Sequence, residues 1–165
     1  MTRKLDYTIR AFEPRDAAAF AGLNRRWIDS LFAMEEKDKV QLEHPQSAIL
    51  DKGGYIAIAE ANGWVIGTGA ILPAALAPDD GKTWFEIVKM STDLAAQRMG
   101  IGSKILEKLI TFAKENGADA IWLETNDRLE AATHLYRKTG FQDLSGEDIW
   151  ETPYKRCNMQ MAMQL

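Results

Sequence analysis

The sequence predicts an α/β or α+β layer fold around a mixed β-sheet. β-rich and helical segments follow one another in the order β-α-β-β-β-α-β-α-β, which is typical of helices packed on a sheet. The chain has 165 residues, 46% of them hydrophobic and 27% charged, which suits one globular domain with a sizeable core. No repeat, low-complexity tract or linker divides it. We therefore expect a single domain over residues 1–165.

The first half of the chain combines a strand, a helix and a hairpin. The stretch DYTIRAF predicts the first strand, which ends at Glu13-Pro14. RDAAAFAGLNRRWIDSLF has helical spacing with Asp16 as its N-cap, and its apolar face consists of Ala19, Phe20, Leu23, Trp27 and Leu31. The polar segment 33–50 predicts short helical pieces around Pro45. Two β-rich runs flank Ala-Asn-Gly in GGYIAIAEANGWVIGTGAIL, which predicts a β-hairpin.

The second half alternates strands with amphipathic helices. WFEIVKMST and DAIWLETN predict strands, the second of them buried, and PYKRCNMQMAMQL alternates as a last strand. GIGSKILEKLITFAKENGA predicts a helix that Asn116-Gly117 ends as a C-cap. Its buried side is formed by Ile101, Ile105, Leu106, Leu109, Ile110 and Ala113. RLEAATHLYRKTGF predicts a helix that begins near Arg128 and ends at Gly140.

Composition excludes several functional classes. The formal net charge is −4 and no basic cluster occurs, so we expect no nucleic-acid partner. The one cysteine, Cys157, excludes an internal disulfide and favours a reducing, cytoplasmic compartment; we interpret it as a small packed residue rather than a nucleophile. His44 and His134 with this cysteine are too few for a structural zinc site, so we expect no metal. No apolar run predicts a signal peptide or a membrane span.

The stretch RMGIG, residues 98–102, places two glycines where a strand turns into a helix. Glycines at such a turn allow a ligand to approach the backbone, and the free N–H groups of the first helical turn face that ligand. The pattern indicates an anion site, most often for phosphate. Ile105 breaks the dinucleotide fingerprint, and Ser103 preceding Lys104 breaks the Walker A pattern. The alternative is a glycine turn that only allows the helix and the strand to pack.

Several motifs together resemble one known family. QRMGIG fits the pattern Q/R-x-x-G-x-G/A, which resembles the pyrophosphate-binding loop of the GNAT superfamily of N-acetyltransferases. AATHLYRKTGF is similar to that superfamily's A-x-x-L-Y-x-K-x-G-F segment, and AIWLETN lies where its fifth strand is expected. TIRAFEPRDAAAF and GWVIGTGAIL resemble its usual opening and hairpin. The resemblance covers nearly the whole chain in the right order.

The resemblance implies a fold and a cosubstrate. The fold would have a mixed sheet of about six to seven strands, with splayed fourth and fifth strands and helices on both faces. Acetyl-CoA would lie in the gap, with its pantetheine on backbone groups of the fourth strand and its pyrophosphate on amides of the glycine loop. The implied cofactor-binding residues are Met90, Thr92, Gln97, Arg98, Met99, Gly100, Ile101, Gly102, Ser103 and Asn126.

The resemblance also implies the catalytic groups. Tyr136 matches the family's tyrosine, whose phenol would protonate the departing thiolate or bind its sulfur; otherwise it is a packing residue. Glu86 is the candidate base, directly or through a water, with a rim carboxylate as the alternative. Leu129 stands where many members have Asn, which puts one coenzyme contact in doubt. A Lys89–Glu124 cross-strand pair remains open, and we expect His134 at the surface.

The acceptor is less well defined. In the superfamily the first helix and the following loop wall the acceptor site, which here gives an apolar Trp27, Phe32 and Met34 and an acidic Glu35 and Glu36. Tyr154 is expected to reach the cleft, and Arg156 or Arg10 would suit a substrate carboxylate. We therefore expect an N-acetyltransferase acting on a primary amine of a small molecule or amino acid, by direct attack in a ternary complex. A protein or peptide acceptor, a non-catalytic acyl-CoA sensor, a longer acyl group and a homodimer stay open.

Overall fold

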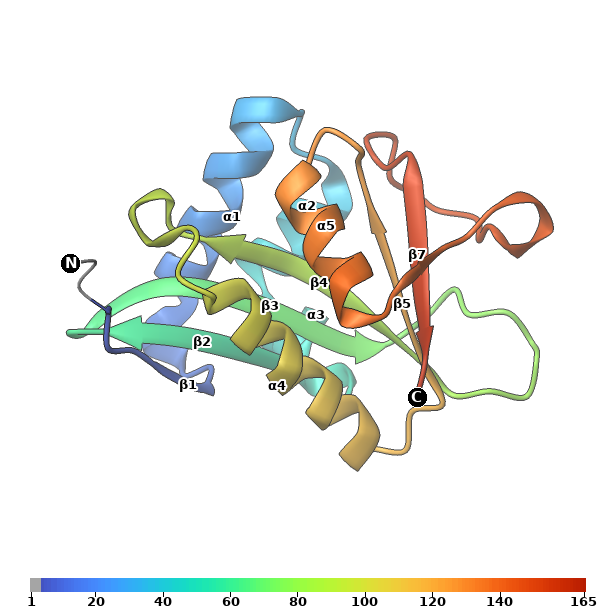
Figure 1. The fold of residues 1–165 in the computed structure, drawn as a ribbon, viewed down its shortest axis with the longest axis horizontal. Helices are drawn as coiled ribbons and strands as arrows, with labels where there is room; N and C mark the ends of the chain where they lie inside the picture. Colours follow the sequence, from blue (N-terminus) through green and yellow to red (C-terminus); the bar gives the residue numbers. More distant parts are fainter. Residues whose placement is uncertain (1–3) are drawn as a thin grey trace.

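The computed structural model describes residues 4–165, which form one mixed sheet of seven strands in the order β1-β2-β3-β4-β5-β7-β6 (Figure 1). This confirms the predicted mixed sheet. The strands span Thr8–Ala11 (β1), Tyr55–Ala61 (β2), Trp64–Pro73 (β3), Trp84–Thr92 (β4), Ala120–Thr125 (β5), Gln142–Asp143 (β6) and Met159–Gln164 (β7). All neighbours are antiparallel except β4 and β5, which are parallel.

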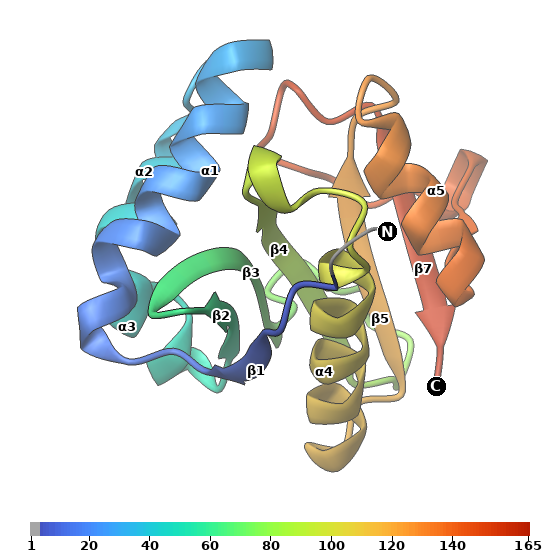
Figure 2. The ribbon, with the colours of Figure 1, turned by 60° about the vertical axis from the view of Figure 1, so that its left-hand side comes forward.

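Helices cover both faces of this sheet, as predicted. Figure 2 shows α1, α2 and α3 on one side of the strands and α4 with α5 on the other. The helices span Ala17–Leu31 (α1), Glu36–Glu43 (α2), Pro45–Ala48 (α3), Ile101–Glu115 (α4) and Glu130–Thr139 (α5). Among the described residues, no helix is both long enough and apolar enough to cross a membrane.

Strand β2 shows how the alternation of side chains builds two cores. Ile56 and Ile58 are fully buried among residues of α1 to α3, whereas Ala57 and Ala59 face α4. Period-2 alternation sends neighbouring side chains to opposite faces, so one strand serves both layers. The small Ala57 and Ala59 leave room for the larger Ile101, Ile105 and Leu109 of α4, which are almost completely buried.

Turn and cap residues are mostly as predicted. Asn62 and Gly63 both have positive φ, 52° and 80°, as a two-residue hairpin turn between β2 and β3 requires. Asn116 and Gly117 end α4. The prediction for Asp16 was only half right: it occupies the N-cap position of α1, but its carboxylate accepts no capping hydrogen bond from that helix. It accepts hydrogen bonds from the Arg10 guanidinium and the Glu13 backbone N–H instead.

Strands β4 and β5 separate after four residue pairs. Trp84 to Ile87 of β4 lie beside Ala120 to Leu123 of β5, and beyond Ile87 each strand pairs only with its outer neighbour. A bulge in β4 accompanies the separation: Ala70 pairs with Val88 and Thr68 with Ser91, so Gly69 faces two residues of β4. Lys89, one of these two, has a left-handed φ of 54°. This confirms the splayed fourth and fifth strands.

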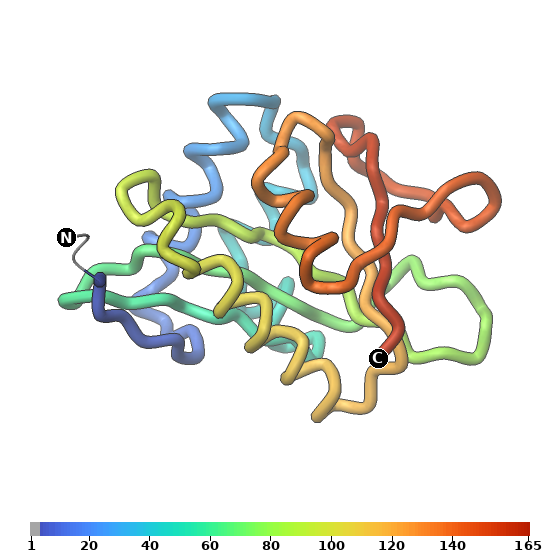
Figure 3. The backbone as a smooth tube through the Cα atoms, viewed as in Figure 1, coloured from blue at the N-terminus to red at the C-terminus, as the bar shows by residue number. Residues whose placement is uncertain are grey.

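The C-terminal part differs from the sequence prediction. Helix α5 begins at Glu130, two residues later than expected, and a short strand β6 follows it. The last strand is confined to Met159–Gln164, so the predicted strand over 153–165 was too long. Figure 3 follows the backbone from α5 through residues 144–158, which form a long loop that leads into β7. In this loop the Arg156 side chain bonds Asp38 of α2, as described below, and the Trp150 ring stacks on Trp122 of β5.

Candidate active site

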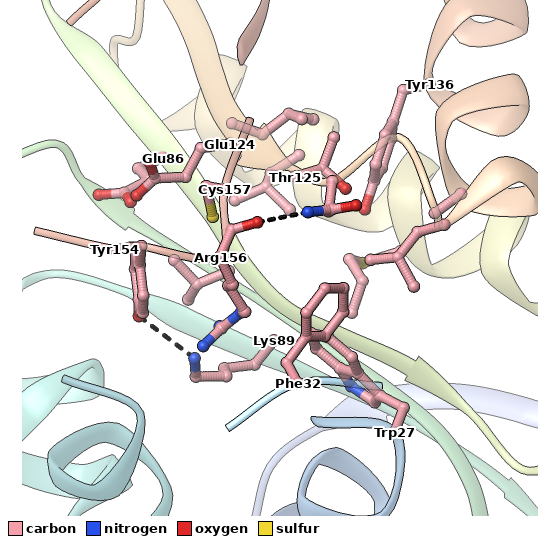
Figure 4. A pocket seen from close by; sticks show the side chains of 17 residues that line it. Trp27, Phe32, Glu86, Lys89, Glu124, Thr125, Tyr136, Tyr154, Arg156 and Cys157 are labelled. Atoms are coloured by element: carbon pink, nitrogen blue, oxygen red, sulfur yellow. Dashed lines mark hydrogen bonds between the residues drawn. The ribbon is translucent and has the colours of Figure 1, made fainter. Parts of the chain in front are cut away.

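A pocket occupies the gap between the splayed strands (Figure 4). It receives side chains from α1, β4, β5, α5 and the loop before β7. Its lining includes eight residues that the sequence predicted for the site: Trp27, Phe32, Glu86, Met90, Asn126, Tyr136, Tyr154 and Arg156. It also includes Lys89, Glu124, Leu129 and Cys157, together with Ile87, Val88, Leu123, Thr125 and Ala132. The fold therefore brings most of the predicted catalytic and acceptor residues together.

The pocket joins the two faces of the sheet. Tyr136 packs in the core between the sheet and α4, together with Ile87 and Leu123. Glu86 alternates with Ile87 and so points to the opposite face, where Lys37 of α2 lies 3.8 Å from its carboxylate. The gap between the strands therefore brings groups from both faces of the sheet to one pocket.

The loop between β4 and α4 offers a row of free amides. The backbone N–H groups from Arg98 to Ser103 donate to no backbone carbonyl within residues 4–165. Arg98 and Gly100 both have left-handed φ, 65° and 77°, which turns successive N–H groups toward one side. The positive end of the α4 dipole adds to their attraction for an anion. The loop geometry suits an anion, and its predicted contact with the pyrophosphate of coenzyme A stays a prediction.

Replacing Ser103 with proline tests this loop by removing one free N–H. Ser103 is exposed and lies in the first turn of α4, where proline fits without loss of a helical hydrogen bond. Losing one charge-assisted hydrogen bond is expected to raise the dissociation constant for coenzyme A about tenfold or more. Isothermal titration of the variant beside Ser103→Ala measures this. Equal affinities in the two variants would contradict the assignment.

Gly102 also has a packing role that the sequence did not indicate, while its predicted contact with the coenzyme stays a prediction. A Cβ on Gly102 would lie 3.3 Å from Cδ2 of Leu135 in α5. A larger residue there would first press on α5, so a Gly102→Val variant mixes a packing defect with any effect on the ligand. At Gly100, in contrast, a Cβ would meet nothing within 4 Å, and the positive φ explains the glycine. Leu135 is half-buried and packs against the core, and His134 is exposed, as predicted.

Tyr136 lies on α5 with its hydroxyl end directed into the pocket (Figure 4). The ring is 6% exposed and packs edge-on against Phe141, with the ring centroids 5.9 Å apart. Burial raises the pKa of the phenol well above its usual value, so the hydroxyl keeps its proton at neutral pH. It is therefore available as a proton donor inside the pocket.

A buried ion cluster of Asp38, Lys89 and Arg156 lies beside the pocket. Asp38 of α2 is fully buried and accepts hydrogen bonds from Lys89 Nζ, at 2.5 Å, and from two nitrogens of Arg156. Lys89 also donates to the Tyr154 hydroxyl, and three cations surround the Tyr154 ring at 4.5 to 5.3 Å from its centroid. The cluster fastens α2, β4 and the loop before β7 to one another. It also shows that Lys89 does not pair with Glu124, which corrects that possibility.

The other acceptor predictions divide in two. Trp27 and Phe32 line the pocket with their rings 6.3 Å apart, edge to face, whereas Met34 packs in the core under α1. Glu35 accepts hydrogen bonds from the backbone N–H groups of Lys155 and Arg156, so it holds the loop and does not line the pocket. The exposed Glu36 does not line it either.

The two arginines proposed for a substrate carboxylate are both engaged by the protein. Arg10 does not reach the pocket: it lies on β1, where Asp16 and Glu60 accept its hydrogen bonds. This part of the expectation was wrong. Arg156 lines the pocket, but its guanidinium is already bound by Asp38 and lies 3.5 Å from Glu35. Its role toward a substrate carboxylate stays a prediction.

Three predicted coenzyme contacts have partners within the protein. The Asn126 side chain donates to the Arg156 carbonyl and accepts from the Arg128 N–H, so it joins β5 to the loop before β7. The Thr92 carbonyl accepts a hydrogen bond from Arg26. Met90 lines the pocket and packs against the core. Whether they also bind pantetheine stays a prediction, as it does for Gln97.

Two site residues were missed from the sequence. Asp38 and Lys37 both lie in a polar segment, EEKDKVQLE, whose composition is typical of an exposed helix. Asp38 is the fully buried partner of two cations, and Lys37 is the cation beside Glu86. Their partners are distant in sequence, so no local pattern could have indicated them. Among residues 4–165, no group of three or more His, Cys, Asp or Glu side chains is arranged to hold a metal ion.

Comparisons with known proteins agree with this geometry. In sequence, the chain is 29% identical over 126 residues to a probable N-acetyltransferase camello of Xenopus tropicalis, a match that covers 76% of this chain but only 55% of that protein. In structure, a GNAT-family acetyltransferase from Staphylococcus aureus Mu50 superposes with a TM-score of 0.84 at 21% identity, covering 96% of this chain and 99% of that one. The structure of yncA from Salmonella typhimurium with its cofactor acetyl-CoA superposes with a TM-score of 0.74 at 21% identity, covering 96% and 93%.

The family itself follows from the sequence match. The sequence profile of the acetyltransferase (GNAT) family matches residues 20–141, which is well over half of the chain. This range includes the amide loop, both splayed strands and Tyr136. The chain belongs to the acetyltransferase (GNAT) family.

Proposed function

We propose that this protein transfers an acetyl group from acetyl-CoA to a primary amine of a small molecule or amino acid. The observation that carries the proposal is the pocket through the sheet, which joins Tyr136 on one face to Glu86 on the other. The free amides from Arg98 to Ser103 would hold the pyrophosphate at the first side. Trp27 and Phe32 line the pocket with two packed aromatic rings, which favours a small acceptor over a folded protein. The lone cysteine supports a cytoplasmic location.

The residues of the pocket account for both proton transfers. Acetyl-CoA supplies an activated thioester carbonyl. Glu86 takes a proton from the acceptor ammonium, directly or through a water, which frees the nitrogen lone pair for attack on that carbonyl. The C–N bond forms and the C–S bond breaks. Tyr136 donates its proton to the departing thiolate and recovers one as the amide nitrogen loses its second proton. No covalent enzyme intermediate is needed.

A panel of amines tests the function. Thiol release from acetyl-CoA is measured with small amines, amino acids and short peptides that have a free N-terminus, and the acetylated product is identified by mass. We expect amine-dependent release that matches the amount of product. Release with peptides alone would favour the peptide acceptor. Tight binding of acetyl-CoA without release for any amine would favour an acyl-CoA sensor.

Glu86→Gln tests the base. Burial raises the pKa of Glu86, and the charges of Lys37 and Lys89 oppose this only in part. A base acts when it is deprotonated, so the rate should rise as pH passes upward through this raised pKa. We expect Glu86→Gln to lower turnover by only about tenfold, because some free amine is always present in solution. The rise of the rate with pH, the acid limb of the pH–rate profile, should become flat. Acetyl-CoA binding should not change, and the exposed Glu115→Gln serves as the matched control. An unchanged limb at full rate would place the base elsewhere.

A further inference from the structure

Glu124 is a carboxylate that the fold buries without a partner. It follows Leu123, the last residue of β5 that pairs with β4, and it lines the pocket. Both of its oxygens are buried and have no hydrogen-bond partner among residues 4–165. A buried charge without a partner is costly, so such groups are normally paired in a protein interior. The nearby Thr152 side chain and the charges of Lys37 and Arg156 lower the pKa of Glu124 only in part.

Glu86 is its neighbour across the gap. Glu86 pairs with Trp122 in the register, and Trp122 and Glu124 point to the same face, so the two glutamates lie diagonally on one face. Figure 4 shows both side chains together at one end of the pocket. The Glu86 side chain is 8% exposed, and one of its oxygens also has no hydrogen-bond partner within the described chain. Two carboxylates therefore meet in the pocket with unused acceptor capacity.

The surrounding cations do not neutralise this pair. On the loop before β7, Arg156 is held by Asp38, and on β4 so is Lys89. This leaves Lys37 on α2, at 3.8 Å from Glu86. The other titratable groups that line the pocket there, Tyr154 and Cys157, have pKa values raised by burial and stay neutral near pH 7. One loosely held cation thus faces two carboxylates.

Because too few cations face the two glutamates, the pKa values of both carboxyl groups are raised. Burial raises the pKa of Glu124 to about 7; the Thr152 side chain opposes this shift and the charge of Glu86 adds to it. Burial raises the pKa of Glu86 as well. Like charges at short range cannot both ionise freely, so the two groups titrate as a coupled pair. Near neutral pH the pair can both bind a cation and accept a proton.

We propose that Glu124 is a second acceptor-binding carboxylate, and that Glu86 and Glu124 together bind the ammonium group of the acceptor and take up its proton. The inference rests on the proposed function. An ammonium group has several N–H donors, and two carboxylates can accept two of them at once. One N–H bond breaks, its proton passes to a carboxylate oxygen and later to solvent, and the lone pair remains on the nitrogen. The pair selects acceptors that are cationic at neutral pH, such as alkyl amines, over neutral aromatic amines.

A kinetic comparison tests the role of Glu124 in acceptor binding. With an amine that the wild type acetylates, Glu124→Gln is expected to raise KM for the amine about tenfold and to change kcat less. Its acid limb should move to lower pH, because Glu86 then titrates without a neighbouring charge. Acetyl-CoA affinity should stay the same, Glu124→Asp should recover part of the loss, and Glu115→Gln is the matched control. A variant with wild-type KM and an unmoved limb would overturn the proposal.

A spectroscopic experiment needs no turnover. In protein labelled with 13C at glutamate carboxyls, the resonances lost in Glu86→Gln and Glu124→Gln identify the two groups. We expect the Glu124 resonance to titrate near pH 7 and the Glu86 resonance above its usual range, and both to shift with ethylammonium chloride but not with sodium chloride at the same concentration. Resonances that titrate near pH 4.5 or ignore ethylammonium would overturn the inference. If the pair responds while no amine is acetylated, the carboxylate pair stands and the proposed function fails.

The pair also predicts how stability depends on pH. The folded-state pKa of Glu124 is raised to about 7, so the folded protein binds more protons than the unfolded chain between pH 4.5 and 7. Stability should therefore fall as pH rises through this interval, and Glu124→Gln should remove that fall. Thermal melts should show a variant more stable than wild type at pH 8 and equal to it at pH 4. Equal melting temperatures for the variant and the wild type at both pH values would show that Glu124 is not a buried carboxylate with a raised pKa.

Discussion

Asp38→Ala is expected to lower the free energy of unfolding by about 3–5 kcal/mol, because it leaves the buried Lys89 without a counter-charge and Arg156 with only Glu35, 3.5 Å away. Asp38 is fully buried, and the side chains of Lys89 and Arg156 are 2% and 10% exposed. Neither cation can reach water easily once the carboxylate is gone. Chemical denaturation measures the loss. Acetyl-CoA and amine binding should weaken too, since α2 and the loop before β7 lose their shared anchor.

The matched control for this prediction is an ion pair at the surface. Arg137 and Asp143 form an ion pair with two hydrogen bonds, and both side chains are 49% exposed. Asp143→Ala is expected to cost about 1 kcal/mol or less, because water screens the pair. Similar losses in the two variants would mean that the buried cluster contributes no more than a surface pair.

The effect of Asp38 should fade in acid. Burial alone would raise the pKa of Asp38, but the hydrogen bonds from Arg156 and the charge of Lys89 outweigh it and lower the pKa to about 2. A carboxylate with a lowered folded-state pKa stabilises the protein above its unfolded pKa and loses this effect as pH falls toward 2. The difference between wild type and Asp38→Ala should thus be full at pH 7 and shrink below pH 4.

Tyr136→Phe is expected to reduce turnover by about 10²-fold or more, the low end for a positioned general acid. The substitution keeps the ring against Phe141 and removes only the hydroxyl, so the melting temperature and acetyl-CoA affinity should change little. Steady-state rates with a demonstrated acceptor measure the effect. Tyr55→Phe is the matched control, because Tyr55 stacks on Phe112 and does not line the pocket.

Smaller losses have a defined meaning. A thiolate of coenzyme A can leave without a proton, so a drop of only a few-fold would mean that the hydroxyl orients the sulfur. Wild-type turnover in Tyr136→Phe would remove this residue from the mechanism and leave it a packing role.

Features set by neighbouring residues were predictable from the sequence. The amide loop around Gly100 and the hairpin turn at Asn62-Gly63 follow from local backbone requirements. Tyr136 was singled out because its segment resembles the GNAT motif A-x-x-L-Y-x-K-x-G-F, and the fold class followed from the order of the elements. The loop and the turn depend on the backbone of a few adjacent residues, so a single sequence contains the information they need.

The ion cluster could not be predicted, because its members are far apart in the chain. Asp38 meets Lys89 across 51 positions and Arg156 across 118. Regular strand alternation would also direct Lys89 to the face opposite Glu86, and only the left-handed backbone at the bulge turns it toward α2. Arg10 and Glu35 were misjudged for the same reason: their partners, Glu60 and the loop at Lys155, could be identified only in the folded structure.

The position of β7 has a consequence for how the chain folds. β7 comes last among the strands but inserts between β5 and β6, both of which precede it in sequence. Until it docks, one edge of β5 stays open, and that strand contains Ile121, Trp122 and Leu123 in a row. An open apolar edge is a template for pairing with another chain. Aggregation during refolding should therefore depend on how quickly residues 159–164 reach β5, a long-range step that is slow relative to formation of the β2–β3 hairpin.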